Sequence, residues 1–192
     1  MEHQANRHLG TRAVAETLRT NGTERSGAAV ALALSVVMLA AGMGQAQVVG
    51  DEAELDRLRA KAEDAMGNDD AEGAAMNMGR AALMAAQLGK RHTDPALRQV
   101  FKATEHLYRS QEHGYRGLAL FRRAGGELPA SAGVCGSLQL AQLELQHVQE
   151  TLGGSEPAEK HAASARLPAV RQTADDWTIV LGSMQSEFRC PN

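Results

Sequence analysis

Cys135 and Cys190 are the residues of this 192-residue chain whose chemistry is easiest to predict. A thiol can bind a metal, attack a substrate or join another thiol in a disulfide, and the spacing of the cysteines helps to decide among these. The two cysteines lie far apart in the sequence, which fits neither a zinc motif nor covalent haem attachment. One disulfide between them is therefore predicted, with two unpaired buried thiols as the alternative.

Histidines close to glutamates form a second group of candidates, because these side chains bind metals or transfer protons. His106 and His113 are each preceded by a glutamate, and on one continuous helix they would share a face, about 10 Å apart. That distance is too long for both to bind one ion directly. Glu144 and His147 have the Glu-x-x-His spacing of di-iron bundles, but such sites need two of these motifs and the chain has one. A solvated helix face is predicted in both places, rather than a metal site.

Methionines offer the last candidate ligands. Met76, Met78 and Met84, with Met66 nearby, carry thioethers that could bind Cu(I). In an alanine-rich helix, however, methionine more often fills gaps in the core. The chain has no glycine-rich phosphate loop after a strand and no recognisable nucleophile turn. The sequence therefore predicts no cofactor and no enzymatic activity.

Residues 27–46 form an uncharged apolar run that ends in Gly44-Gln45-Ala46. A short apolar helix followed by small residues is typical of a secretory signal peptide. The apolar core, residues 28–41, is shorter than the roughly 20 residues that a membrane-spanning helix needs. We therefore predict a leader over 1–46, cleaved after Ala46, and a periplasmic or secreted mature protein. An uncleaved amino-terminal anchor remains the alternative, because the region before the apolar run is long.

The remaining residues, 47–192, are predicted to form one mature domain that has no membrane contact once the leader is removed. The leader holds four arginines and three glutamates, so residues 47–192 carry 16 basic and 20 acidic side chains, a net charge of −4. This balance argues against nucleic-acid binding, which needs a basic surface. Alanine and leucine are abundant and aromatic residues make up only 3% of the chain, which favours an all-α fold. One disulfide between Cys135 and Cys190 would also be compatible with export, because disulfides persist in oxidising compartments outside the cytosol.

The first two helices of the mature domain are predicted from apolar spacing and from capping residues. Leucines and alanines at intervals of three and four indicate a helix over 51–66. Asp69 is expected to cap the next helix, with Glu72 completing a capping box. Gly89 is expected to end that helix.

The middle of the chain is predicted to hold two further helices. Asp94 and Pro95 form a start signal, with a capping side chain before a proline in the first turn. Gly114 is expected to break the helix, and Gly125-Gly126 to end the next one. This raises the expected count to about six helices, arranged as antiparallel hairpins in a repeat-like stack or a helical bundle.

Two apolar stripes predict the last two helices. One is formed by Val134, Leu138, Ala141, Leu145, Val148 and Leu152. The other is formed by Val170, Ala174, Trp177, Leu181, Met184 and Phe188, and Pro168 just before it is expected to kink or restart the helix. Stripes of equal length joined by a short connection should pack antiparallel. This packing would bring Cys135, at the start of one helix, next to Cys190, after the end of the other.

Residues 101–129 resemble a tetratricopeptide repeat, a pair of antiparallel helices in which large and small residues alternate at fixed intervals. The matching positions are Phe101, Tyr108, Gly117, Phe121, Ala124 and Pro129. Thr104 and Glu105 depart from the pattern, where the family has leucine and glycine. The resemblance implies a stack of helical hairpins that binds a peptide or protein partner, and it implies no catalytic chemistry.

These observations lead to two hypotheses of function. The first is an exported, non-enzymatic helical protein that binds a protein or peptide partner in the cell envelope. The alternative is a helical bundle that binds a small ligand or a metal in the periplasm. An enzyme whose residues meet only in the folded chain is a more remote third possibility.

Overall fold

The computed structural model describes residues 50–153 and 163–191, which form five helices and no strand. The predicted leader, residues 1–46, lies outside this range. The described residues belong to one compact unit. In this part of the chain no helix has both the length and the apolar character needed to cross a bilayer. The prediction of an all-α fold is confirmed.

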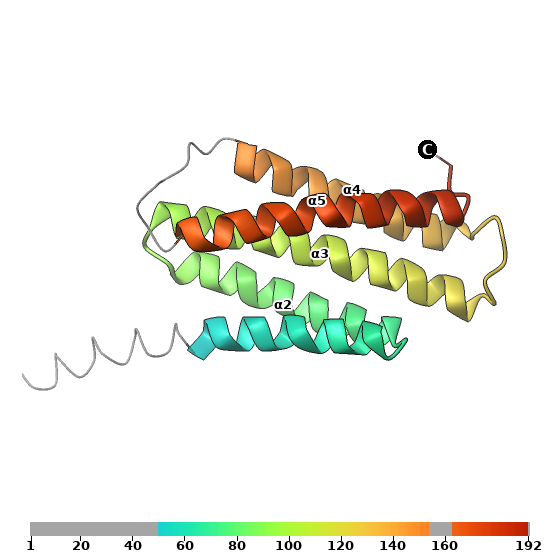
Figure 1. Ribbon diagram of the computed structural model, residues 1–192, viewed down its shortest axis with the longest axis horizontal. Helices are drawn as coiled ribbons and strands as arrows, with labels where there is room; N and C mark the ends of the chain where they lie inside the picture. The colour runs from blue at the N-terminus through green and yellow to red at the C-terminus, as the bar shows by residue number, and fades with distance from the viewer. Residues whose placement is uncertain (1–49, 154–162, 192) are drawn as a thin grey trace, which may run out of the picture. The chain divides into compact units, whose positions relative to one another are not determined.

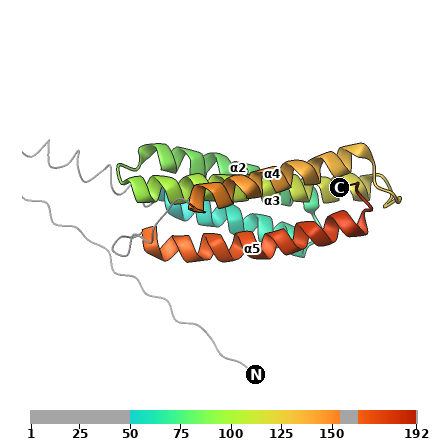
Figure 2. The same ribbon diagram turned by 90° about the horizontal axis from the view of Figure 1, so that it is seen from above.

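The helices are arranged in two layers (Figures 1 and 2). α2, α3 and α4 lie side by side in one layer, with α3 in the middle. The first described helix and α5 cover one face of that layer. The elements are the helix of residues 50–67, α2 (Ala71–Arg91), α3 (Pro95–Arg123), α4 (Ala132–Gly153) and α5 (Ala163–Glu187).

α2 packs closely on α3 because its buried face consists mostly of alanine. Small side chains let two helix backbones approach, so contacts form along the length of the pair. The buried residues of α2 are Ala71, Ala74, Ala75, Met78, Ala81, Ala82, Ala85 and Leu88. Five of them belong to one hydrophobic core that extends to the helix of residues 50–67, α3, α4 and α5: Met78, Ala81, Ala82, Ala85 and Leu88.

α3 is one continuous helix, and the break expected at Gly114 is wrong. This glycine serves close packing instead. A Cβ at Gly114 would lie 2.5 Å from Cζ2 of Trp177, which belongs to α5. A Cβ at Gly117 would lie 3.2 Å from a methyl carbon of Leu138, which belongs to α4. Because α3 is unbroken, the described residues form five helices, where about six were expected.

A hydrogen-bonded relay through Ser110 joins α3, α4 and α5. The indole N–H of Trp177 donates to Oγ of Ser110 at 3.0 Å. The Ser110 hydroxyl donates in turn to the carbonyl oxygen of Ala141 at 2.7 Å. Ser110 is fully buried, so both bonds are shielded from water. Each should contribute about 1 kcal/mol net, and losing one partner would leave a buried polar group unpaired.

The ends of α2 differ by one or two residues from the prediction. The N-cap is Asp70, whose carboxylate accepts a hydrogen bond from the Gly73 N–H at 2.8 Å. Asp69 instead adopts a left-handed conformation, with φ of 64°. α2 also continues past Gly89 to Arg91. Gly89 lies against α3, where a Cβ would be in ordinary contact with Cβ of Phe101 at 3.5 Å.

The other predicted helix boundaries agree better with the structure. Asp94 caps α3, accepting from the Ala96 N–H at 2.8 Å, and Pro95 stands in the first turn. After α3, Gly125 and Gly126 have φ of 79° and 73°, values that glycine adopts without strain. α5 runs through Pro168 without restarting.

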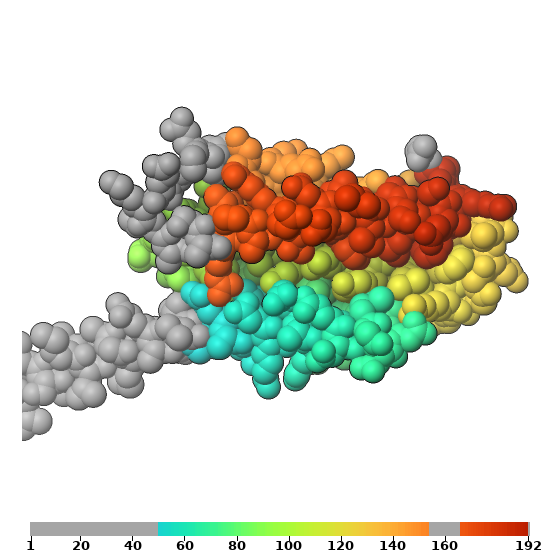
Figure 3. Space-filling view, in the orientation of Figure 1, coloured from blue at the N-terminus to red at the C-terminus, as the bar shows by residue number. Residues whose placement is uncertain are grey.

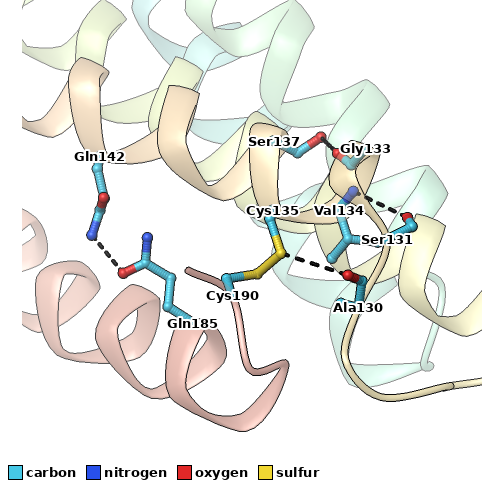
Figure 4. The surroundings of a disulfide bond; sticks show 9 residues. All are labelled: Ala130, Ser131, Gly133, Val134, Cys135, Ser137, Gln142, Gln185 and Cys190. Atoms are coloured by element: carbon cyan, nitrogen blue, oxygen red, sulfur yellow. Dashed lines mark hydrogen bonds between the residues drawn. A yellow bond between two sulfur atoms is a disulfide. The ribbon is translucent and has the colours of Figure 1, made fainter. Parts of the chain in front are cut away.

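α4 and α5 are antiparallel, and their cysteines meet as predicted (Figure 4). Cys135 and Cys190 form a disulfide with a Cα–Cα distance of 5.4 Å. Nearby, the side-chain amides of Gln142 and Gln185 are hydrogen bonded at 2.6 Å. The backbone N–H of Ala130 donates to the carbonyl of Phe188 at 2.9 Å, which ties the α3–α4 loop to the end of α5.

We predict that Cys135→Ser and Cys190→Ser each lower the free energy of unfolding by about 4 kcal/mol, because the crosslink restricts a long loop of the unfolded chain. Denaturant unfolding in oxidising buffer measures this loss. The double variant should lose no more than either single variant, and the reduced parent should match them. Variants that unfold like the oxidised parent would show that the crosslink contributes nothing.

We predict that Gly114→Ala destabilises the protein by about 1–3 kcal/mol, because the added methyl group meets the Trp177 ring. In an open helix position the same change is stabilising. Gly182→Ala is the matched control, since no atom lies within 4 Å of a Cβ at this position in α5. It should stabilise by about 0.5–1 kcal/mol. Equal effects of the two changes on chemical unfolding would contradict the packing role of Gly114.

Candidate functional site

The candidate site is a cleft of about 280 Å³ between the helix of residues 50–67 and α5, with α3 as its floor. We call it the α3 cleft. Figure 3 shows α3 exposed between the other two helices. The floor is formed by Thr104, Leu107, Tyr108 and Gln111, and the walls by Asp56, Arg59, Glu63, Arg166, Ala169, Val170 and Thr173.

The floor combines apolar surface with polar groups that can bind a ligand. Thr104, Leu107 and Gln111 are spaced by three and four residues, which places them on one face of α3. The Thr104 hydroxyl donates to the Val100 carbonyl at 2.8 Å and is therefore occupied. The Gln111 side chain is 8% exposed, and its Oε1 has no hydrogen-bond partner among the described residues. A buried acceptor left unpaired costs about 1–3 kcal/mol, so a donor that reached this oxygen would be stabilising.

Tyr108 adds a phenol that stays protonated at neutral pH. Burial raises the pKa of Tyr108 to about 12, although Arg59 and Arg166 act in the opposite direction. Its side chain is 6% exposed. A neutral phenol can both donate and accept a hydrogen bond. Together with the Gln111 amide, it gives the floor of the α3 cleft neutral hydrogen-bonding chemistry.

The charged residues of the walls are paired with one another. Arg166 contacts Glu52 at 2.8 Å and Asp56 at 3.6 Å, which links the two walls. Its guanidinium also lies 5.6 Å from the centre of the Phe101 ring. On the opposite wall, Arg59 is paired with Glu63 at 2.5 Å. These pairs give the cleft an edge of mixed charge that favours neither anions nor cations.

Two other hollows lack this chemistry. A groove of about 500 Å³ lies between α2 and α3, and two arginines on its edge are paired with glutamates, Arg123 with Glu72 and Arg116 with Glu112. A third hollow, of about 260 Å³, lies between α4 and α5 and is lined mostly by glutamines, leucines and a threonine. None of the described residues that line these two hollows has a buried side-chain atom without a partner. The α3 cleft is therefore the strongest candidate.

The residues that resemble a tetratricopeptide repeat do not form a hairpin. Phe101, Tyr108, Gly117 and Phe121 all lie on α3, and a hairpin would need a turn between them. Their spacing reflects the packing of one helix against several neighbours. Phe101 stacks on His92, with ring centres 4.9 Å apart, and Phe121 stacks on Phe188 at 4.1 Å. Ala124 and Pro129, the last two matching positions, lie exposed after the end of α3.

The histidine and glutamate candidates meet across the α3–α4 interface. His106 Nδ1 lies 2.7 Å from Glu144 Oε2, and the ring centres of His106 and His147 are 5.2 Å apart. His113, two turns further along α3, is half-buried, and burial lowers its pKa against the opposing effect of Glu112. No group of three or more histidine, cysteine or acidic residues suited to a metal ion occurs among the described residues.

The methionines, the remaining candidates from the sequence, differ in how deeply they are buried. Met78 is 1% exposed and belongs to the core, whereas Met76 is 55% exposed. Met84 packs partly buried at the edge of the core. The methionines therefore present their sulfurs to different surroundings, which does not favour copper binding.

Gln111 was missed by the analysis of the sequence, although a signal was present. It lies one turn beyond Leu107 and two turns beyond Thr104, so it falls on the buried side of its helix. A long amide at such a position needs partners inside the fold. The sequence gives no means of knowing that these partners are incomplete, because the neighbouring helices decide them.

We predict that alkaline conditions destabilise the protein partly through Tyr108. The unfolded chain loses the phenol proton near pH 10, whereas the folded chain keeps it up to about pH 12. This contribution to stability is therefore complete below pH 10 and is lost as the pH rises towards 12, by about 3 kcal/mol at most. Tyr108→Phe should show a correspondingly smaller alkaline loss in urea unfolding. An identical loss in parent and variant would contradict the buried, protonated phenol.

Comparisons with known proteins add no relative. No protein-family model, curated protein or solved structure matches this chain. The function must therefore be inferred from the residues of the α3 cleft and from their surroundings.

Proposed function

We propose that this chain is an exported, non-enzymatic binding protein of the cell envelope, and that its α3 cleft holds a segment of a protein or peptide partner. The observation that carries the proposal is the unpaired Oε1 of Gln111, a buried acceptor in a cleft that has room for a ligand.

A peptide group matches the chemistry of the cleft floor. It carries an N–H donor and a carbonyl acceptor, and it has no net charge. The N–H can donate to Gln111 Oε1, and the carbonyl can accept from the Tyr108 hydroxyl. These two residues lie three positions apart on α3, so they face the same side of the helix. Leu107 and Val170 supply apolar surface for a side chain of the partner.

The cleft walls support binding rather than catalysis. The described residues that line the cleft include no histidine, cysteine or serine. Its acidic residues lie beside arginines: Glu63 is paired with Arg59, and Asp56 lies 3.6 Å from Arg166. Both carboxylates of the cleft lining are therefore already engaged with a guanidinium group.

The disulfide supports the location in the cell envelope. Disulfides persist in oxidising compartments and are rare in the reducing cytosol. Cys135 and Cys190 are joined, and no free cysteine remains among the described residues. This agrees with the export predicted from residues 27–46.

A small neutral ligand is the second candidate, and the size of the cleft favours it. Its volume of about 280 Å³ is near the lower end of the range for small-molecule sites, roughly 300–1,000 Å³. Such a ligand would need a hydroxyl or amide donor for Gln111 and an apolar part for Leu107. Both candidates use the same chemistry, so one variant tests both.

We predict that Gln111→Met weakens binding at least fivefold while leaving the unliganded protein as stable as the parent or more stable, because the change removes an unpaired buried acceptor. Binding is measured by ligand-observed NMR against a library of short neutral peptides and a library of small neutral fragments. Gln149→Met, an exposed position on α4, is the matched control and should bind like the parent.

The outcomes separate the hypotheses. If peptides bind the Gln111→Met variant more weakly than the parent, the proposal is supported. If only small fragments lose affinity for this variant, the small-ligand alternative is supported. Ligands that bind equally well to both variants would place binding outside the cleft. If no member of either library binds the parent, water alone occupies the cleft and the proposal is wrong.

A further inference from the structure

A pair of histidines on the α3–α4 interface lies apart from the α3 cleft and has no role in the function proposed above. His106 comes from α3 and His147 from α4. Their side chains are 20% and 42% exposed, so solvent and small ions can reach both. The ring centres lie 5.2 Å apart, and the ring planes are inclined by 46°.

This separation fits two imidazoles that bind one metal ion. In a tetrahedral site each nitrogen lies about 2.0–2.1 Å from zinc, which places the two ring centres about 5 Å apart. Stacked rings would instead lie nearly parallel. The observed inclination of 46° is therefore not that of a stacked pair.

Each ring also has a carboxylate at Nδ1. His106 Nδ1 is 2.7 Å from Glu144 Oε2, and His147 Nδ1 is 3.1 Å from Glu150 Oε2. A carboxylate that accepts from Nδ1–H leaves the lone pair on Nε2, which is the form that binds metals. Metal-binding histidines commonly have such a partner, which orients the ring and makes it a stronger ligand. The two negative charges also favour a cation.

We propose that His106 and His147 bind a divalent transition metal, with zinc as the natural probe, through their Nε2 atoms. Two protein ligands leave the other coordination positions to water or to a group on a partner. Imidazole ligands suit zinc, copper and nickel better than magnesium or calcium. The site joins α3 to α4, so metal binding should also stabilise the folded chain.

The test is a zinc titration of the untagged, disulfide-bonded chain, by calorimetry and by thermal unfolding. His106→Ala and His147→Ala should each weaken zinc affinity at least tenfold and abolish the rise in melting temperature that zinc produces in the parent. Glu144→Gln should weaken affinity severalfold, because it removes the charge at Nδ1 of His106. Circular dichroism checks that each variant is folded.

His113→Ala is the matched control, since this histidine lies on the same helix but outside the pair. It should change zinc affinity less than twofold. A parent that binds zinc no better than the His106→Ala, His147→Ala double variant would overturn the proposal. Equal weakening by His113→Ala would overturn it as well, because binding would then not be specific to the pair.

Discussion

α3 contacts α2, α4 and α5, and the small residues along it set how closely those helices approach. Ser110, Gly114 and Gly117 lie on one helix at intervals of four and three. Gly114 leaves space for the Trp177 ring, and Gly117 leaves space for Leu138. Ser110 joins α4 and α5 through two buried hydrogen bonds. The positions of all the functional candidates follow from this packing.

The same helix divides its surface among different neighbours. One face holds the small residues and the core. Another carries Tyr108 and Gln111 into the α3 cleft, and a third presents His106 to α4. A polar side chain on one of the buried faces of α3 needs partners from the helices packed against that face. Where a hydrogen-bond partner is missing, as at Oε1 of Gln111, a ligand could supply the missing donor.

The ends of the bundle are held by different interactions. At the disulfide end, Cys135 and Cys190 fix the antiparallel register of α4 and α5, and Phe121 stacks on Phe188. At the opposite end, Arg166 joins α5 to the helix of residues 50–67 by an ion pair with Glu52. Ion pairs with partly exposed partners contribute little to stability. The helices that form the cleft walls are also held by the apolar core, which includes Leu55, Leu58 and Val170.

Local signals in the sequence determined the all-α class, the start of α3 at Asp94 and Pro95, the apolar stripes of the last two helices and the pairing of Cys135 with Cys190. These features depend on the intervals between residues along a helix, and those intervals can be read from the sequence alone. The tertiary structure alone decided the role of Gly114, the unpaired oxygen of Gln111 and the meeting of His106 with Glu144 and His147. A glycine in a helix weakens it unless a neighbour needs the space, and a polar side chain is paired or unpaired according to what lies opposite. Both depend on the register between helices, which no single helix encodes.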